Sequence, residues 1–167
     1  MKYLFLLLTA FLFSIAGFAQ QDTASTPPPS YTLFPLPQFS VLLPDSTTWF
    51  TKKDLPKNKK TMVMVFSPDC EHCQHETELI KADMAKFKRV QILMVTPMPF
   101  TKMKEFYKKY ELDKYKNVTV GYDPKFFFNN YFKMRMFPFI AVYDKKYTLL
   151  KTFEGNPKMD DLLKYVK

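Results

Sequence analysis

The sequence predicts an α/β fold in three layers, with a central mixed β-sheet and helices on both faces. Two short, continuous apolar runs rich in β-forming residues, Thr61–Phe66 and Val90–Val95, are typical of strands buried on both faces. Each run is followed by a stretch in which apolar residues recur at helical spacing. This alternation of strand and helix favours a layered α/β architecture.

The first 37 residues differ in composition from the rest of the chain. Residues 1–19 combine a positive charge, an apolar run and small residues at Gly17 and Ala19, which is the pattern of a secretory signal peptide cleaved after Ala19. An uncleaved membrane anchor is the less favoured alternative, because the apolar run is shorter than the roughly 20 residues that span a bilayer. Residues 20–37 are rich in proline and predict an extended tether. We expect one globular domain over residues 38–167.

The formal net charge of +9 comes almost entirely from lysine. The lysines are scattered along helix-like stretches and loops, without an aromatic-basic repeat or a groove-reading motif. This distribution predicts a solvated basic surface rather than a nucleic-acid site. We therefore expect no nucleic-acid partner.

The elements of the domain follow in order. A short leading hairpin is predicted from Phe39–Leu43 and Thr47–Phe50, which flank a turn at Pro44-Asp45. After the first buried strand, the spacing of apolar residues predicts a helix from Cys73 to Lys88. In chain order, the elements after the second buried strand are a helix from about Thr101, a short strand at Val118–Val120, a helix opened by Asp123-Pro124, paired strands at Phe139–Tyr143 and Tyr147–Phe153, and a closing helix from about Asn156.

The only two cysteines, Cys70 and Cys73, lie where the first buried strand turns into a helix. A disulfide that closes so short a loop constrains the unfolded chain little, so a purely structural role explains the pair poorly. The free N–H groups at a helix start stabilise a thiolate on Cys70, and Cys73, one turn further, can attack a mixed disulfide. Export, the CxxC spacing and the strand-to-helix junction together predict a redox-active centre.

The segment Ser67-Pro-Asp-Cys-Glu-His-Cys-Gln-His-Glu76 resembles the active site of the TlpA/ResA-like extracytoplasmic thioredoxin-fold proteins, where WCxPCxxE is usual. The resemblance covers Gln38 to the C-terminus and implies a thioredoxin-like fold, with a helix and a short strand inserted between Val90 and Pro138. It also implies that Phe137-Pro138 forms a cis-proline loop facing the cysteines. In that loop Pro138 would shape the substrate-facing surface and Phe137 would contact the partner's backbone.

Several positions depart from the family pattern. The usual tryptophan before the first cysteine is absent, His72 replaces the proline between the cysteines, and Met64 replaces the buried acid of ordinary thioredoxins. Glu76, on the same helical side as Cys73, is then the candidate for proton transfer, with a solvated glutamate paired to a lysine as the alternative. His72 can place positive charge beside Cys70 and raise the reduction potential, or can simply be exposed helix surface.

The resemblance implies a thiol-disulfide oxidoreductase that exchanges its Cys70–Cys73 pair with exported protein partners in the periplasm and is recharged by a membrane-linked redox partner. We expect a monomer that acts as a reductant, with a thiol oxidase of the same fold as the alternative. A further alternative is a non-enzymatic module that binds a soft metal or a partner. Cys70, Cys73, His72 and His75 are metal-ligand types, but a closed zinc site usually adds a second ligand pair, and Gln74 stands where c-type haem attachment needs histidine. No metal or organic cofactor is expected.

Overall fold

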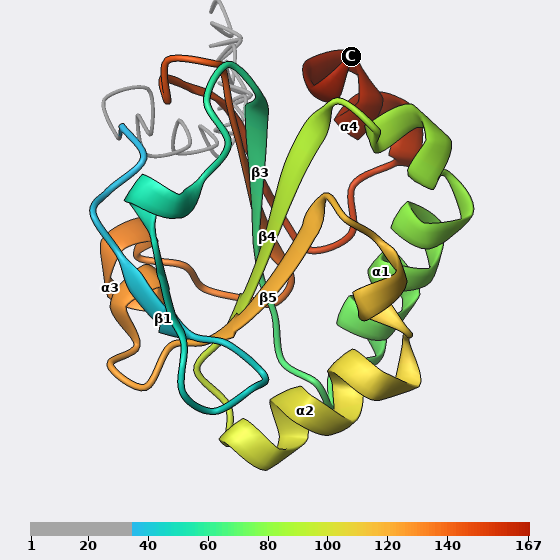
Figure 1. Ribbon diagram of the computed structural model, residues 1–167. Coiled ribbons are helices and arrows are strands. Elements are labelled where there is room, and N and C mark those ends of the chain that lie inside the picture. Colours follow the sequence, from blue (N-terminus) through green and yellow to red (C-terminus); the bar gives the residue numbers. More distant parts are fainter. Residues whose placement is uncertain (1–34) are drawn as a thin grey trace, which may run out of the picture.

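The computed structural model describes residues 35–167, which form one seven-stranded mixed sheet with the order β2-β1-β5-β4-β3-β6-β7 (Figure 1). The three central strands β3 (Lys60–Val65), β4 (Val90–Thr96) and β5 (Val118–Tyr122) run parallel, with β4 in the middle. β6 (Phe139–Tyr143) pairs antiparallel with β3, and β7 (Leu149–Glu154) pairs antiparallel with β6. The mixed sheet is confirmed. The expected signal peptide and most of the expected tether lie outside the described residues.

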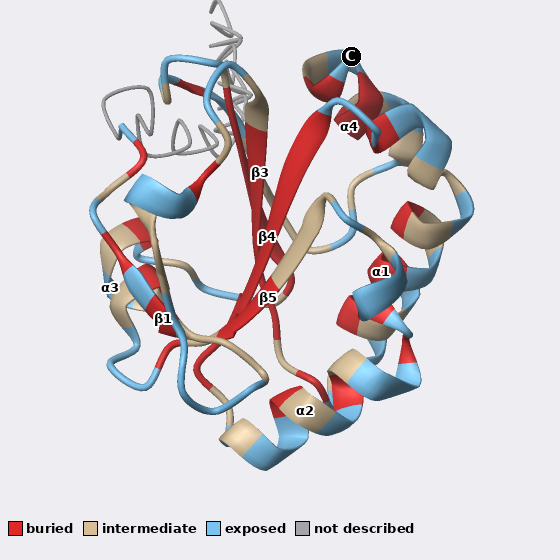
Figure 2. Ribbon diagram, viewed as in Figure 1, coloured by how far each residue is buried: buried red, intermediate tan, exposed pale blue. Residues whose placement is uncertain are grey.

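Among residues 35–167, four α-helices cover the two faces of the sheet. The helices α1 (Glu71–Ala82), α2 (Phe100–Lys109) and α4 (Met159–Val166) contribute buried residues to one core cluster, and α3 (Phe127–Phe132) contributes to the other. Figure 1 shows the same division, with α3 on one side of the sheet and the other three helices opposite. The strands β3, β4 and β6 are buried along almost their whole length, whereas β5 is partly exposed (Figure 2). The predicted three layers are therefore confirmed.

The leading hairpin is present as β1 (Ser40–Leu42) and β2 (Trp49–Thr51), which pair antiparallel with Val41 opposite Phe50. β1 also pairs with β5, so the hairpin extends the sheet beyond its parallel centre. Leu36 is buried, and its N–H donates to the carbonyl of Tyr147 at 3.1 Å. The packed part of the chain thus reaches back to Leu36.

The predicted helix from Cys73 to Lys88 is too long. α1 ends at Ala82, and a separate 3-10 helix spans Met84–Phe87. Asp83 leaves the helical conformation with φ −99° and ψ 16°, and its carboxylate pairs with Lys86 at 2.9 Å. Because the tighter turn still directs Phe87 into the core, the apolar spacing looked like a continuous helix.

Two further helix starts were predicted too early. α3 begins at Phe127 instead of near Asp123, because Phe126 takes a left-handed conformation with φ 52°. The Asp123 carboxylate nevertheless accepts the N–H of Phe128 at 2.9 Å, so it satisfies a free donor of the first turn. α4 begins at Met159, and Asn156 instead directs its side chain to α1.

Candidate active site

The two cysteines lie at the start of α1, directly after the carboxyl end of β3. Cys70 is the N-cap residue, with extended backbone at φ −86° and ψ 117°, and its carbonyl accepts the N–H of Gln74 at 3.0 Å. Cys73 follows in the first helical turn. Both thiols are free, with Cys70 partly exposed and Cys73 fully buried. Only one of the two sulfurs is therefore accessible to a large partner.

The loop between β3 and α1 is held by bonds within the motif. The Cys70 N–H donates to the carbonyl of Ser67 at 3.2 Å, and the Gln74 side chain donates to the carbonyl of Pro68 at 2.9 Å. The first bond closes the turn onto the N-cap residue, and the second joins the turn to the helix. The position of Cys70 is consequently set by the backbone rather than by its side chain.

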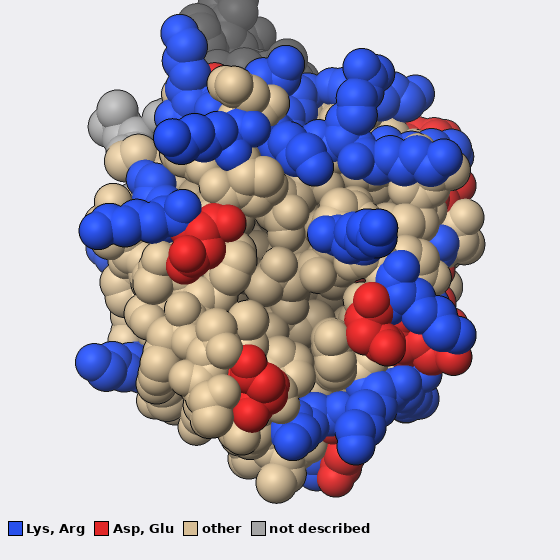
Figure 3. Space-filling model, in the orientation of Figure 1, with Lys and Arg blue, Asp and Glu red and all other residues tan. Residues whose placement is uncertain are grey.

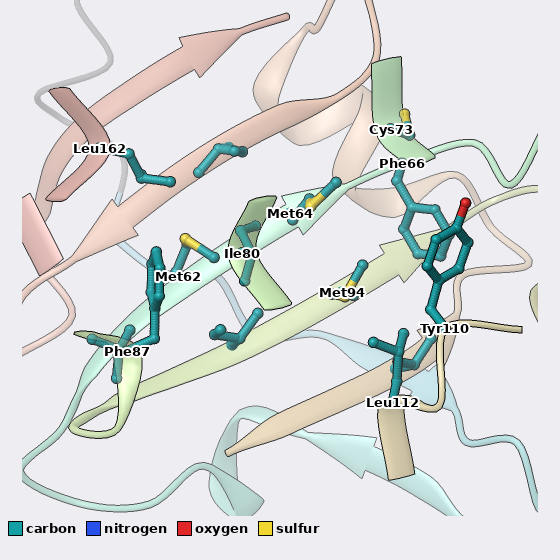
Figure 4. Packing of buried hydrophobic residues seen from close by; sticks show 14 of the residues in the cluster. Met62, Met64, Phe66, Cys73, Ile80, Phe87, Met94, Tyr110, Leu112 and Leu162 are labelled. Carbon is teal, nitrogen blue, oxygen red and sulfur yellow. The ribbon is translucent and has the colours of Figure 1, made fainter. Parts of the chain in front are cut away.

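Cys73 lies in the apolar cluster on one face of the sheet. The same cluster includes Met64 on β3 and Phe66 directly after that strand, and Figure 4 shows Cys73 at the Phe66 end of the cluster. Burial raises the pKa of the Cys73 thiol, although the Ser67 N–H, 3.5 Å from the sulfur, acts in the opposite direction. Cys73 therefore needs a nearby base to become a nucleophile.

Glu76 is fully buried on the side of α1 that carries Cys73. Its Oε2 accepts a hydrogen bond from Asn156 Nδ2 at 3.1 Å, and its Oε1 has no hydrogen-bond partner. Burial raises the pKa of this carboxyl, and the Asn156 bond partly opposes that rise. The alternative of a solvated glutamate paired with lysine therefore does not hold.

The Phe137–Pro138 segment meets the cysteines from the other side. Its peptide bond is cis, and the Phe137 carbonyl oxygen lies 4.0 Å from Cys70 Sγ. Pro138 is buried, and its carbonyl accepts the N–H of Gly155 at 2.8 Å. The loop before β6 thus forms one wall beside the accessible sulfur.

The two histidines of the motif are exposed, and the backbone carbonyl of His72 accepts a hydrogen bond from the Asn156 side chain at 2.8 Å. The structure therefore brings together Cys70, Cys73, Glu76, Phe137 and Pro138, but leaves the His72 side chain on the surface. Within residues 35–167, no three His, Cys, Asp or Glu side chains gather in a way that could hold a metal ion.

Asn156 is a site residue that the sequence did not reveal. It lies 84 residues after His72 and 80 residues after Glu76. Its side-chain amide donates hydrogen bonds to the carbonyl of His72 and to the carboxylate of Glu76. Its local sequence, Asn156-Pro157, indicates only a helix start. No signal in a single sequence connects it with the CxxC motif.

The fold and the paired cysteines define a thioredoxin-like thiol-disulfide oxidoreductase. Residues 34–158 match the AhpC/TSA family, and the chain belongs to that family. Among solved structures, the chain is similar to DsbF of Mycobacterium tuberculosis, at 24% identity and a TM-score of 0.65 over 77% of this chain and 92% of that one. No curated protein sequence matches the chain.

Two other solved structures share the fold. A secreted Mycobacterium tuberculosis disulfide oxidoreductase homologous to E. coli DsbE is 20% identical, with a TM-score of 0.63 over 77% of this chain and 94% of that one. A Neisseria meningitidis protein assigned as a thioredoxin is 26% identical, with a TM-score of 0.61 over 77% of this chain and 84% of that one. The expected resemblance to thioredoxin-fold proteins of the TlpA/ResA-like type is confirmed.

Proposed function

We propose that the protein reduces disulfide bonds of exported proteins, with Cys70 as the attacking thiol and Cys73 as the resolving thiol. The contrast between the two sulfurs carries this proposal: Cys70 is partly exposed beside the Phe137 carbonyl, whereas Cys73 is fully buried. A partner disulfide can reach the first sulfur but not the second. Phe137 and Pro138 form the surface against which the partner's backbone would lie.

The exchange proceeds in two steps. The Cys70 thiolate attacks one sulfur of the partner disulfide, and the other partner sulfur leaves as a thiolate that takes a proton from water. Cys73 then passes its proton to the Glu76 carboxylate and attacks Cys70 Sγ, which releases the second partner sulfur. The partner gains two electrons, and the Cys70–Cys73 disulfide remains until a membrane-linked reductant restores it.

The raised pKa of Glu76 suits this role, because a carboxyl that titrates closer to neutral pH accepts a thiol proton more readily than an ordinary one. The unpartnered Oε1 leaves one oxygen available for that proton. The glutamate therefore supplies the base that Met64 cannot provide.

Reduction is the favoured direction because the TlpA/ResA-like resemblance implies it. The His72 imidazole, which could raise the potential, is exposed, where solvent screens its charge. The secretory pattern of residues 1–19 supports a periplasmic location for the mature monomer, and the similar Mycobacterium tuberculosis oxidoreductase is a secreted protein. Within residues 35–167, no helix is long and apolar enough to cross a membrane.

The test is to equilibrate the protein with glutathione redox buffers and to measure the fraction of Cys70–Cys73 disulfide by alkylation and mass spectrometry. Because the exposed His72 imidazole can raise the potential only slightly, we expect a value a little above the about −270 mV of thioredoxin and well below the about −120 mV of DsbA. In a matched assay, the reduced protein should reduce a disulfide peptide faster than the oxidised protein oxidises the dithiol peptide. The reverse order of rates would favour the oxidase alternative, and the Cys70→Ser variant is the inactive control.

A further inference from the structure

A large group of the lysines of this chain lies at one end of the sheet, opposite the cysteines. The pairing of Lys60 with Val90 and of Ile92 with Val118 places the amino ends of β3, β4 and β5 along one edge. Because β6 runs antiparallel to β3, with Thr61 opposite Tyr143, its carboxyl end lies at that edge too. Cys70 follows the carboxyl end of β3 and so lies at the far edge.

Every segment that reaches this edge carries basic residues. We call the group the basic end and define it as Lys57, Lys59, Lys60, Lys86, Lys88, Arg89, Lys114, Lys116, Lys145, Lys146 and Lys167. A hollow of about 420 Å³ there is lined by basic side chains from four of these segments, Lys60, Lys86, Arg89, Lys145 and Lys167, together with Val166. Figure 3 shows the resulting band of Lys and Arg across the end at which β3 and β4 begin.

Most of this charge is not neutralised within the described residues. Lys86 pairs with Asp83 at 2.9 Å and Lys114 pairs with Glu111. The carboxylate of Asp144 accepts hydrogen bonds from the backbone N–H groups of Lys146 and Thr148. No ion pair joins Lys88, Arg89, Lys116 or Lys145 to a carboxylate among residues 35–167, and all four are exposed. The basic end is thus a broad positive surface made by separate loops.

We propose that the basic end docks the domain on an anionic lipid surface, with the Cys70 edge facing away from the membrane. The residue types favour lipid over a folded acidic partner, because lysine is a strongly hydrated point charge that suits a diffuse anionic surface, whereas paired recognition of carboxylates favours arginine. Arg89 is the only arginine in the group. The geometry agrees, since docking at the amino ends of the parallel strands leaves the carboxyl end of β3 open to protein partners.

The experiment uses the full chain and two vesicle compositions, phosphatidylcholine alone and phosphatidylcholine with 30% phosphatidylglycerol. Co-sedimentation should show stronger binding to the anionic vesicles, and 0.5 M NaCl should remove that difference. The variant Lys88→Glu/Lys116→Glu/Lys145→Glu should lose about 10²-fold in affinity for the anionic vesicles. Binding to neutral vesicles through the apolar N-terminal run would be the same in every variant and cancels in the comparison.

The matched control reverses the same number of charges elsewhere, as Lys104→Glu/Lys108→Glu/Lys125→Glu. These lysines lie on α2 and after β5, outside the basic end, and none has an ion pair among the described residues. If position matters rather than net charge, the fold-loss of affinity in the control should be at least about ten times smaller than the fold-loss in the basic-end variant. Equal losses in the two variants, or no dependence on phosphatidylglycerol, would overturn the proposal.

A second readout reports orientation directly. On anionic vesicles, Lys88, Lys116 and Lys145 should be protected from acetylation, while Lys125 stays reactive and Cys70 is alkylated at its rate in solution. Protection of Cys70 instead would contradict the proposed orientation. Binding to soluble polyglutamate that depends on the basic end, without any binding to anionic vesicles, would point to an acidic protein partner and overturn the lipid assignment.

Discussion

Asn156 Nδ2 donates to Glu76 Oε2 at 3.1 Å, which joins the segment before α4 to the buried carboxyl beside Cys73. The same amide group donates to the carbonyl of His72 at 2.8 Å, within the first turn of α1. One side chain therefore fixes both the carboxyl and the turn that carries the cysteines. The predictions below begin with this contact.

Asn156→Ala should slow decay of the mixed disulfide and destabilise the reduced protein by about 1–3 kcal/mol, the usual cost of leaving a buried polar group without its partner. Because the Asn156 bond lowers the pKa of Glu76, its loss should also move the Glu76-dependent step in the pH–rate profile to higher pH. Stopped-flow rates over a pH series measure the shift. An unchanged profile in a folded variant would reduce Asn156 to a purely structural residue.

Glu76→Gln should slow the resolving step within the roughly 10² to 10⁴-fold range typical of positioned proton transfer. The first attack by Cys70 should be nearly unchanged, because Glu76 is buried on the side of α1 that carries Cys73, whereas the Cys70 sulfur is partly exposed. Stopped-flow measurement with a model disulfide peptide separates formation of the mixed disulfide from its decay. If decay were unaffected at every pH, water and not Glu76 would be the base.

The stability of the reduced protein should depend on pH through Glu76. Its pKa is raised in the folded state above the ordinary value of 4.5, so folding disfavours the charged form. The contribution of the protonated Glu76 carboxyl to the free energy of unfolding is therefore complete below about pH 4.5. It is lost as the pH rises through the pKa that Glu76 has in the folded protein. Urea unfolding of the wild type and of Glu76→Gln should agree most closely at low pH, with the variant becoming relatively more stable above it. If the free energies of unfolding of the two proteins differed by the same amount at every pH, Glu76 would titrate as it does in the unfolded chain.

Gly121 marks the contact between the leading hairpin and the central sheet. A Cβ at this position would lie 2.4 Å from Cγ2 of Val41, which is buried on β1. Gly121→Ala should therefore cost about 1–3 kcal/mol by overpacking, and adding Val41→Ala should cost less than the sum of the two single changes. Urea denaturation of the three variants measures the coupling. Additive losses would show that the strand shifts without strain.

The sequence predicted the buried central strands of a mixed sheet and the position of the cysteine pair, because buried strands and a CxxC motif leave local signals. Helix ends were harder to predict, since Phe87 is buried from a 3-10 turn as well as it would be from an α-helix. The bond between Asn156 and Glu76 could not be predicted, because it depends on how β7 and α4 place a distant loop. The clustering of scattered lysines at one edge likewise emerges only from the strand order.

The central claim is that Cys70 attacks and Cys73 resolves. Cys73→Ser and Cys70→Ser form a matched pair, because each keeps one thiol of the motif. Each reduced variant is mixed with a disulfide peptide, and the adduct is located by mass spectrometry of tryptic fragments. The account predicts a rapid, long-lived adduct on Cys70 in the Cys73→Ser variant and little adduct in the Cys70→Ser variant, since Cys73 is buried. Equally rapid adduct formation on Cys73 would contradict it.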